Sequence, residues 1–335
     1  MTSKNVRALV ADRINDQVSV VIKELSVDNL PPGEVLVRVA YSDVNYKDGL
    51  ACSPTGRVAK TYPIIPGIDF AGTVVESSFT GIKPGENVLA TGYEMGVSRH
   101  GGFSEYSRVP ANWVVRLPSG MTLRDSMVFG TAGLTAALSI NSLQINGLTP
   151  DTGPVVVTGA PGGVGSIAVA LLSKMGYEVV ASTRKRESAT EYLTRLGAAQ
   201  VISTNEISMS NHRALEKESW AGAVDTVGGE TLSALIRKTK YRGSIAACGL
   251  TGGAEVSATV YPFVLRGVNL LGIESVYCPM SLRLLLWNKL ANDWKLPKNI
   301  LDMISSEIVL EQLPLKLKEI LEGQVRGRTV VRLVS

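Results

Sequence analysis

The first third of the chain alternates short hydrophobic runs with glycine and proline. The runs are rich in valine and five to seven residues long, which is typical of strands. We predict strands over residues 6–10, 18–24, 35–41, 70–75, 87–91, 103–109 and 113–117. Their close spacing favours a compact, barrel-like β domain.

A helical pattern begins at Thr122. The Thr122 hydroxyl is suited to cap the first turn, and Asp125 follows three residues later, as in a capping box. We expect this helix to continue through residues 129–137, with a break at the glycines Gly130 and Gly133.

From Pro154 the pattern becomes strand, glycine turn, helix and strand. Residues 155–158 and 178–182 predict strands, and residues 162–175 predict a helix whose apolar positions form one buried stripe. Further βα units are predicted over 187–196, 201–203, 223–227, 232–239, 244–248 and 268–273. Two helices, 280–292 and 312–322, and a strand-like tail, 328–334, end the chain, and the tail could return to the β domain. The pattern therefore predicts an α/β protein that contains a doubly wound parallel sheet.

The composition is that of an ordinary globular protein. The 335 residues are 45% hydrophobic, and 34 basic against 30 acidic residues give a net charge of +4. The charges are scattered, which argues against a nucleic-acid partner. The first 13 residues lack a signal-peptide core, and no run reaches about 18 uninterrupted apolar residues. We expect a cytoplasmic protein without a membrane partner.

Metal and thiol chemistry have few candidate residues. The three cysteines, Cys52, Cys248 and Cys278, form no CxxC pair, and the histidines are His100 and His212 alone. Each cysteine is better interpreted as a small apolar residue than as a nucleophile.

The turn from Gly159 to Gly165 carries the strongest chemical signal. A phosphate needs backbone N–H groups that no side chain covers, with the positive end of a helix dipole behind them. Here the turn follows a valine strand and opens an amphipathic helix, which is the context of a dinucleotide fingerprint. We predict that the pyrophosphate binds at five consecutive residues: Gly162, Gly163, Val164, Gly165 and Ser166.

The end of the second strand indicates which dinucleotide binds. NAD binders place an acidic residue there for the ribose 2′-hydroxyl, whereas NADP binders place small and basic residues. The sequence from Ser182 to Arg186 reads Ser-Thr-Arg-Lys-Arg, with no acidic residue before Glu187. We predict NADP(H) as cofactor, with Ser182, Thr183, Arg184 and Lys185 at its phosphate; a solvated basic turn is the alternative for some of these cations.

Longer motifs resemble a known superfamily. Residues 66–72 resemble the Gly-His-Glu signature of zinc alcohol dehydrogenases, but Ile68 and Asp69 stand where that signature has His and Glu. The chain is more similar to the zinc-free quinone oxidoreductase branch of the medium-chain dehydrogenase/reductases, and within it to the acrylyl-CoA reductase (NADPH) group. The resemblance covers nearly the whole chain and rests on residues 41–48, 63–72, 130–133, 157–165, 220–228, 246–250, 262–266 and 272–276. The basic run that ends at Arg186 is longer than the usual Ser-Gly-Arg turn of the family.

The resemblance implies a GroES-like catalytic domain over residues 1–122, completed by 306–335, and a Rossmann domain over 123–305. It also implies a homodimer, no metal, and a cofactor in a cleft. The nicotinamide would lie near Asn45, Tyr46, Gly49 and Thr131. Further cofactor contacts would come from Gly249, Leu250, Ser275 and Arg328.

Reduction of an activated C=C bond needs a hydride, stabilisation of charge on a carbonyl oxygen, and a proton. We hypothesise that Asn45 and Tyr46 orient or polarise the carbonyl, that Tyr46 or a water donates the proton, and that Asp48 holds the loop. Tyr46 packing against the nicotinamide is the alternative. Lys47 is interpreted as solvent-facing. The cations Arg57, Lys60 and Arg99 are suited to CoA phosphates or are ordinary surface residues.

Three functions remain open from the sequence. The first is reduction of a short 2-enoyl-CoA such as acrylyl-CoA, and the second is a broader NADPH-dependent reduction of quinones or enones. The third is an NADPH-sensing protein without turnover, which the pair Asn45 and Tyr46 argues against, because a sensor needs no donors beside the nicotinamide.

Overall fold

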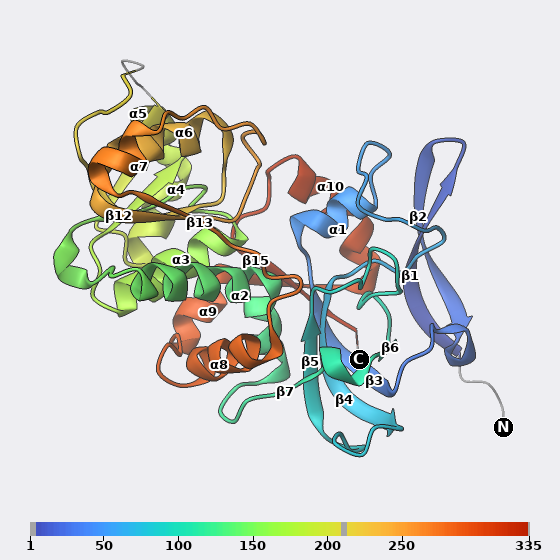
Figure 1. Cartoon of the computed structure of the whole chain (residues 1–335). Coiled ribbons are helices and arrows are strands. Elements are labelled where there is room, and N and C mark those ends of the chain that lie inside the picture. Colours follow the sequence, from blue (N-terminus) through green and yellow to red (C-terminus); the bar gives the residue numbers. More distant parts are fainter. Residues whose placement is uncertain (1–4, 209–212, 334–335) are drawn as a thin grey trace. The chain divides into compact units, whose positions relative to one another are not determined.

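The computed structural model describes residues 5–208 and 213–333 (Figure 1). The chain forms two compact units. Unit 1 contains Met1–Thr131, Val276–Asn292 and Leu301–Ser335, and unit 2 contains Ala132–Ser275 and Asp293–Ile300. The division expected from the sequence differs in assigning residues 123–131, 276–292 and 301–305 to the Rossmann part. The domain boundaries expected from the sequence therefore remain a prediction.

Unit 1 is built mainly on antiparallel strands, with β14 and β15 as a parallel pair. One sheet has the order β14-β15-β3-β4-β5-β7, with β6 paired to β3, and β1 and β2 form a separate hairpin. Its strands are β1 (Asn5–Ile14), β2 (Gln17–Ser26), β3 (Val35–Asp43), β4 (Asp69–Ser77), β5 (Asn87–Thr91), β6 (Tyr106–Val109), β7 (Val115–Arg116), β14 (Ser305–Val309) and β15 (Arg328–Arg332). Its helices are η1 (Val27–Asn29), α1 (Tyr46–Ala51), η2 (Ala111–Trp113), α8 (Met280–Ala291), η4 (Leu310–Gln312) and α10 (Leu313–Leu321), and α9 (Lys298–Ile304) crosses into it from unit 2.

The core of unit 1 follows from the alternation of its strands. Side chains of alternate residues point to one face, and Val37, Val39, Phe70 and Val88 are fully buried there. All the strands predicted for the first third are present, with β6 and β7 shorter than expected. The tail also pairs with β3 through β15, and only Val334 of the predicted tail lies outside the described residues.

Unit 2 contains a parallel six-stranded sheet in the order β10-β9-β8-β11-β12-β13. Numbered along the chain this is 3-2-1-4-5-6, the order of a Rossmann fold, so the predicted fold class is confirmed. The strands are β8 (Val155–Val157), β9 (Val179–Thr183), β10 (Gln200–Ser203), β11 (Trp220–Asp225), β12 (Thr239–Ala247) and β13 (Asn269–Gly272). The helices are η3 (Pro150–Thr152), α3 (Gly163–Lys174), α4 (Arg186–Arg195), α5 (Thr204–Ser208), α6 (Gly229–Lys238) and α7 (Tyr261–Arg266).

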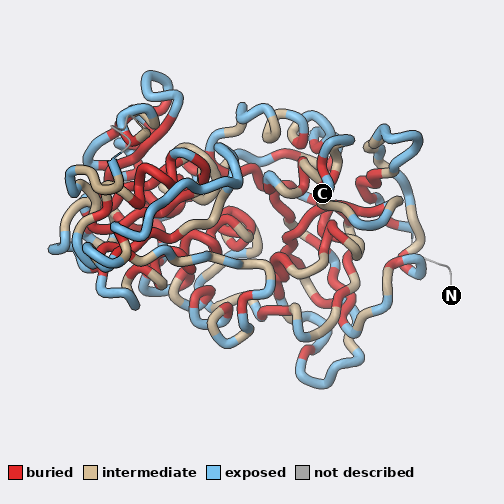
Figure 2. Tube along the Cα trace, turned by 45° about the horizontal axis from the view of Figure 1, so that its top comes forward, coloured by how far each residue is buried: buried red, intermediate tan, exposed pale blue. Residues whose placement is uncertain are grey.

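Helix α2 (Leu123–Ile145) is capped and broken as the sequence predicts. The Asp125 amide donates to the Thr122 hydroxyl at 3.0 Å, and Gly130 has a non-helical backbone with φ 51°. Among the described helices, α2 is long and apolar enough to cross a membrane, but most of it is buried in the protein, as in the core helix of a soluble domain. Figure 2 shows that buried residues dominate the interior of each unit, whereas its loops are exposed.

Candidate functional site

The glycine turn of unit 2 connects β8 to α3 at the point where the strand order reverses. The amide of Gly162 donates to the carbonyl of Gly159 at 2.9 Å, and Gly162 is the N-cap of α3. The first N–H groups of a helix have no partner within it, so those of Gly163, Val164 and Gly165 can donate hydrogen bonds to an anion. The predicted phosphate-binding residues are thus brought together at one helix start.

Two glycines of the turn are required by close packing. Gly159 has φ 56°, and a Cβ at Gly165 would lie 2.5 Å from the Gly159 carbonyl oxygen and 2.7 Å from the Ala160 Cα. A Cβ at Gly162 would lie 3.2 Å from the same oxygen, a much milder contact. Gly165 therefore lets α3 pack on the turn, whereas Gly162 leaves the approach to the backbone open.

The predicted residue Ser166 is buried, and its hydroxyl is used within the protein. It receives a hydrogen bond from the Tyr192 hydroxyl at 2.9 Å and donates to the Ala160 carbonyl at 3.3 Å. Its backbone amide also donates to the Gly162 carbonyl at 2.9 Å, so the hydroxyl and the amide of Ser166 are both used within the protein, and the uncovered N–H groups belong to the residues before it.

The basic run after β9 divides into residues with different surroundings. Ser182 and Thr183 are buried, and the Thr183 hydroxyl receives the Lys185 amide at 3.0 Å. Arg186 forms an ion pair with Glu206 at 3.2 Å. Arg184 and Lys185 are exposed, and Arg184 has no ion pair within the described part of the chain. The sequence offers no reason to prefer one of the three cations, whereas the structure shows that Arg186 is already paired with Glu206.

Thr158 and Asp225 join the ends of β8 and β11, and sequence reasoning missed both. The Thr158 hydroxyl donates to the Asp225 carboxylate at 2.6 Å, and the Gly228 amide donates to the other carboxylate oxygen at 2.8 Å. Burial raises the pKa of Asp225, against the lowering effect of these donors. Parallel strands ending together at a reversal of strand order are where such sheets bind ligands.

The remaining predicted contacts of unit 2 lie after β12 and β13. A Cβ at Gly249 would lie 2.1 Å from the Thr226 carbonyl oxygen, so Gly249 permits a close backbone approach. Leu250 is exposed, and the Ser275 hydroxyl accepts from the Thr135 hydroxyl at 2.9 Å.

A buried polar cluster occupies the centre of unit 1. We define it as Asp43, Asn45, Asp69, Thr131 and Arg328, which come from β3, the start of α1, β4, α2 and β15. The Asn45 amide nitrogen donates to Asp43 at 2.6 Å and to Asp69 at 2.8 Å, and its oxygen accepts from Arg328 at 3.2 Å. Both amide hydrogens are therefore already engaged, and the orientation of the Asn45 amide is fixed.

Arg328 is almost fully buried, and its guanidinium bonds to protein groups. It pairs with Asp43 at 2.7 Å and donates to the carbonyls of Val44 at 3.2 Å and Val128 at 3.1 Å. Burial raises the pKa of Asp43 well above its ordinary value; Arg328 lowers it and the neighbouring carboxylates raise it further. These contacts show that Arg328 holds the cluster together from inside the protein.

Asp48 holds the segment that begins α1. Its carboxylate accepts the Asn45 amide at 2.8 Å and the Ile68 amide at 3.0 Å. Burial raises the pKa of Asp48 to about 7, while the two amides act in the opposite direction. The carboxylate therefore ties the start of α1 to the segment before β4.

Two glycines make room around the cluster. A Cβ at Gly130 would lie 2.0 Å from Asp43 Oδ2, and the positive φ of Gly130 gives the break that directs the Thr131 amide to Asp69 at 2.7 Å. A Cβ at Gly49 would lie 2.9 Å from Leu321, so the missing side chain lets α1 pack on α10.

Tyr46 is the predicted site residue with an available donor. Its side chain is 42% exposed, and its phenol makes no hydrogen bond to any described residue. Arg99, in contrast, donates to the Pro32 carbonyl and lies over the Trp113 ring, so it has a structural role.

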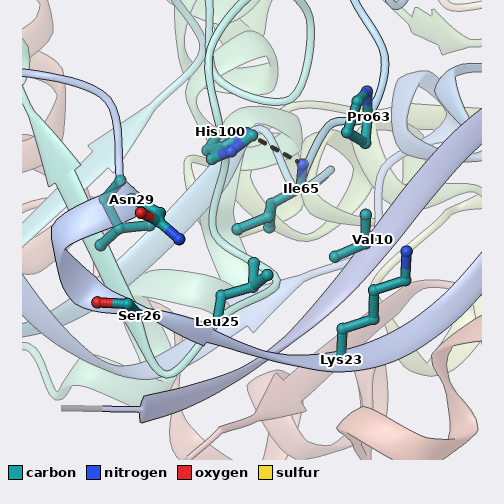
Figure 3. A pocket seen from close by; sticks show the side chains of 9 residues that line it. Val10, Lys23, Leu25, Ser26, Asn29, Pro63, Ile65 and His100 are labelled. Atoms are coloured by element: carbon teal, nitrogen blue, oxygen red, sulfur yellow. Dashed lines mark hydrogen bonds between the residues drawn. The ribbon is translucent and has the colours of Figure 1, made fainter. Parts of the chain in front are cut away.

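A separate pocket of unit 1 contains none of the predicted site residues. It is a cavity of about 130 Å³ lined by Val10, Leu25 and Ile65, with Lys23 and His100 among its polar residues (Figure 3). The Ile65 amide donates to His100 Nδ1 at 3.3 Å, and burial lowers the pKa of this histidine. Within the described residues, no group of three or more His, Cys, Asp or Glu could hold a metal.

Comparisons with known proteins agree with this architecture. Residues 31–119 match the model of the alcohol dehydrogenase GroES-like domain, and residues 163–287 match that of the zinc-binding dehydrogenase. The chain is 52% identical to the Bacillus subtilis protein named "Putative quinone oxidoreductase YhfP", over 98% of both chains. It is 49% identical to acrylyl-CoA reductase AcuI of Ruegeria pomeroyi, over 97% of this chain and 98% of the relative.

Solved structures of similar proteins carry dinucleotides. The yhdH oxidoreductase of Salmonella enterica in complex with NADP has a TM-score of 0.95 and 43% identity, and the match covers 98% of this chain and 100% of that one. The Bacillus subtilis protein yhfP with NAD bound has a TM-score of 0.96 and 52% identity, with coverage of 99% and 100%.

Proposed function

The chain belongs to the medium-chain dehydrogenase/reductase family, and we propose that it reduces an activated C=C bond with NADPH, with a short 2-enoyl-CoA such as acrylyl-CoA as acceptor. The observation that carries the proposal is the 49% identity, across nearly the whole chain, to a relative named acrylyl-CoA reductase. A second candidate is a broader quinone or enone reductase, which the name of the 52% identical relative favours.

The residues of unit 2 fit NADP(H). The first turn of α3 offers uncovered N–H groups to a pyrophosphate, and the end of β9 has no carboxylate for a ribose 2′-hydroxyl. Arg184 and Lys185 are exposed beside that end, where cations would hold a 2′-phosphate, whereas Arg186 is engaged by Glu206. One 52% identical neighbour was crystallised with NAD, whereas two 43% identical neighbours were crystallised with NADP or NADPH.

The side chains of unit 1 fit the remaining chemistry. When bound, the reduced cofactor supplies the hydride. Tyr46 offers a hydroxyl that can donate to the acceptor carbonyl or deliver the proton, and we infer that Asn45 orients this segment through its bonds to Asp43 and Asp69. Asp48 fixes the same segment from the other side by accepting the Asn45 amide.

A metal has no part in the proposed step. Ile68 is apolar and buried, and Asp69 is bonded to Asn45 and Thr131. We therefore assign the stabilisation of the carbonyl oxygen to hydrogen-bond donors of the protein.

The proposal includes a cytoplasmic homodimer whose partner is a small-molecule acceptor. All three cysteines lie within the described residues and form no disulfide there, as is usual in a reducing compartment. The scattered charges, 34 basic against 30 acidic, offer no footprint for nucleic acid or for an acidic membrane surface. Exposed hydrophobic side chains on β13 and around α7 are suited to contact a second copy of the chain: Val260, Tyr261, Val264, Leu265 and Leu270.

One substrate panel tests the proposal. NADPH oxidation is followed with acrylyl-CoA, with a simple quinone and with no acceptor. We expect the kcat/KM for acrylyl-CoA to exceed that for the quinone. A quinone preference would favour the second candidate, and tight NADPH binding without turnover of either acceptor would indicate a cofactor sensor.

A further inference from the structure

The cavity of about 130 Å³ in unit 1 lies beside the β1–β2 hairpin, and the proposed reaction uses none of its residues. Most of its lining is apolar and consists of Val10, Leu25, Leu30, Pro63 and Ile65. An apolar cavity of about 150 Å³ can bind benzene, a ligand of about six non-hydrogen atoms. The space is therefore suited to a small ligand with a hydrocarbon body.

The β1–β2 hairpin presents a cation to this cavity. Alternate residues of two paired strands point to the same face, and the register places Val10, Lys23 and Leu25 on the face that lines the cavity. Glu24 points to the other face, where it lies opposite Arg7. Lys23 forms no ion pair with any residue that the structure describes. Its charge is therefore not neutralised by a carboxylate of the described chain.

His100 adds an N–H donor to the cavity wall. Its Nδ1 accepts the Ile65 amide at 3.3 Å, so the neutral ring carries its hydrogen on Nε2. Burial lowers the pKa of His100, and the positive charge of Arg99 lowers it further, so the ring is neutral at neutral pH. The Nε2–H makes no hydrogen bond to any described residue, and it is free to donate to a ligand.

The polar groups of the lining favour an anionic head on the ligand. The Lys23 ammonium and the His100 Nε2–H only donate, and the Asn29 amide supplies a further NH₂ donor. The lining residues that the structure describes include no carboxylate. Figure 3 shows Asn29 and Lys23 at opposite edges of the cavity, with Leu25 and Ile65 between them. A ligand with one acceptor head and a short hydrocarbon chain would satisfy both parts of this surface.

We propose that this cavity binds a short-chain aliphatic monocarboxylate of about four carbons, with its carboxylate at Lys23 and His100 and its hydrocarbon chain against Leu25 and Ile65. Because Lys23 is exposed to solvent, its attraction for the anion is modest, and we expect a Kd of about 1 mM. The inference goes beyond the proposed function and depends on neither its cofactor nor its acceptor.

The experiment uses sodium butyrate as the probe and follows the imidazole NMR signals of histidine-labelled protein. The chain has two histidines, His100 and His212, and the signal that is missing from His100→Gln belongs to His100. At neutral pH and constant ionic strength, we expect butyrate to shift the His100 signal saturably with a Kd of about 1 mM. The bound anion should also raise the pKa of His100, because a nearby negative charge favours the imidazolium. Butyramide has the same shape without the charge and should bind at least about tenfold more weakly.

Three variants locate the binding. Lys23→Gln removes the cation from an exposed side chain and should weaken butyrate binding about tenfold. Lys83→Gln changes an exposed lysine of unit 1 that does not line the cavity, and as the matched control it should alter the Kd by less than about twofold. Leu25→Trp fills the cavity and should abolish the saturable shift. Thermal melting of each variant verifies that it is folded.

The proposal would be overturned if wild-type His100 showed no saturable shift up to about 20 mM butyrate, or if butyramide bound as well as butyrate. An unchanged Kd in Lys23→Gln, or in folded Leu25→Trp, would also overturn it, because the ligand would then bind elsewhere. Lys23→Gln decides the question even where Leu25→Trp fails to fold, since Lys23 is exposed. No cofactor or acceptor enters the measurement, so its result and that of the NADPH oxidation panel can fail independently.

Discussion

Asn45 and Tyr46 are adjacent in the chain, but their side chains differ in how many hydrogen bonds they make within the protein. The Asn45 amide is bonded at every hydrogen, whereas the Tyr46 phenol has no hydrogen-bond partner among the described residues. We predict that Tyr46→Phe lowers kcat about a hundredfold and leaves NADPH affinity nearly unchanged, because general acid catalysis typically contributes that much. Steady-state kinetics and calorimetry measure the two quantities. Tyr241→Phe, an exposed tyrosine of unit 2, is the control, and an unaltered kcat in Tyr46→Phe would exclude the donor role.

Arg184 lies just after β9 and forms no ion pair with any residue that the structure describes. We predict that Arg184→Gln lowers the preference for NADPH over NADH about tenfold to hundredfold, since a charge-assisted bond to the 2′-phosphate is lost. The ratio of the two dissociation constants measures this preference. Arg186→Gln is the matched control, because Arg186 already pairs with Glu206 and its loss should leave the ratio within about twofold. A larger effect at Arg186 would reverse the assignment.

Asp48 should make stability depend on pH in a defined window. The unfolded chain ionises this carboxyl near its ordinary pKa of 3.8, whereas burial holds the folded pKa at about 7. Between these values the folded protein retains a proton that the unfolded chain has lost, so the contribution of Asp48 to stability falls as pH rises from about 4 to about 7. Outside that window its contribution is level.

Asp48→Asn removes this titration, so the comparison isolates it. We predict that wild-type stability, measured relative to Asp48→Asn by denaturant unfolding, declines across that window and is constant below and above it. Asp151→Asn changes an exposed carboxyl and should show no such trend. A constant difference between wild type and Asp48→Asn from pH 4 to 7 would refute the raised pKa.

The sequence identified site residues where the signal is local and missed those defined by distant partners. Asn45 and Asp48 belong to one short motif, and their contact spans three residues. Asp69 meets Asn45 across 24 residues and Thr131 across 62, and Arg328 meets Asn45 across 283. The pattern of hydrophobic and polar residues along the chain carries no information about such distant contacts. For the same reason, the sequence could not show that Arg186, one of three adjacent cations, pairs with Glu206. This pairing appears only in the folded chain.

At the scale of elements, two glycines of the turn between β8 and α3 have different roles. Gly165 is needed for packing, and Gly162 keeps the backbone accessible to a ligand. We predict that Gly165→Ala destabilises the protein by about 1–3 kcal/mol, because its Cβ would overlap the turn at Gly159 and Ala160. Gly162→Ala should change stability by less than about 0.5 kcal/mol, since its φ is −77° and its Cβ contact is mild. It should nevertheless weaken NADPH binding, because the methyl group covers the approach to the backbone. Unfolding curves and calorimetry of both variants measure these effects, and equal losses of stability would contradict the division of roles.

The strands of the first third and the long helix α2 were predictable, whereas short helices such as α1 were not. The capped start of α2 and its break at Gly130 follow from residue types alone, because a threonine cap and a positive φ each have a local cause. Helix α1 is six residues long and contains Gly49, so its sequence has neither the length nor the propensity of a helix. It forms because the glycine allows packing on α10, which lies far away in the sequence.

At the scale of the whole molecule, one surface of unit 2 is unusual for a monomer. Strand β13 ends the sheet, and large hydrophobic side chains that are 43–70% exposed lie on it and around α7: Val260, Tyr261, Val264, Leu265 and Leu270. An edge strand can pair with another chain, and contiguous exposed apolar side chains mark interaction sites. We therefore infer that a second copy covers this surface through a two-fold, self-complementary contact.

The prediction is that the wild-type protein has the mass of two chains in solution and that Val264→Glu shifts it to one. Val264 is 70% exposed, so the change should not disturb the fold of unit 2, but it would bury a carboxylate in the dimer contact. Light scattering after size exclusion measures the mass. Leu315→Glu places the same charge at a 64% exposed leucine of α10 in unit 1 and should leave the dimer intact. A monomeric wild type would exclude the dimer, and a dimer that survives Val264→Glu but not Leu315→Glu would move the interface to unit 1.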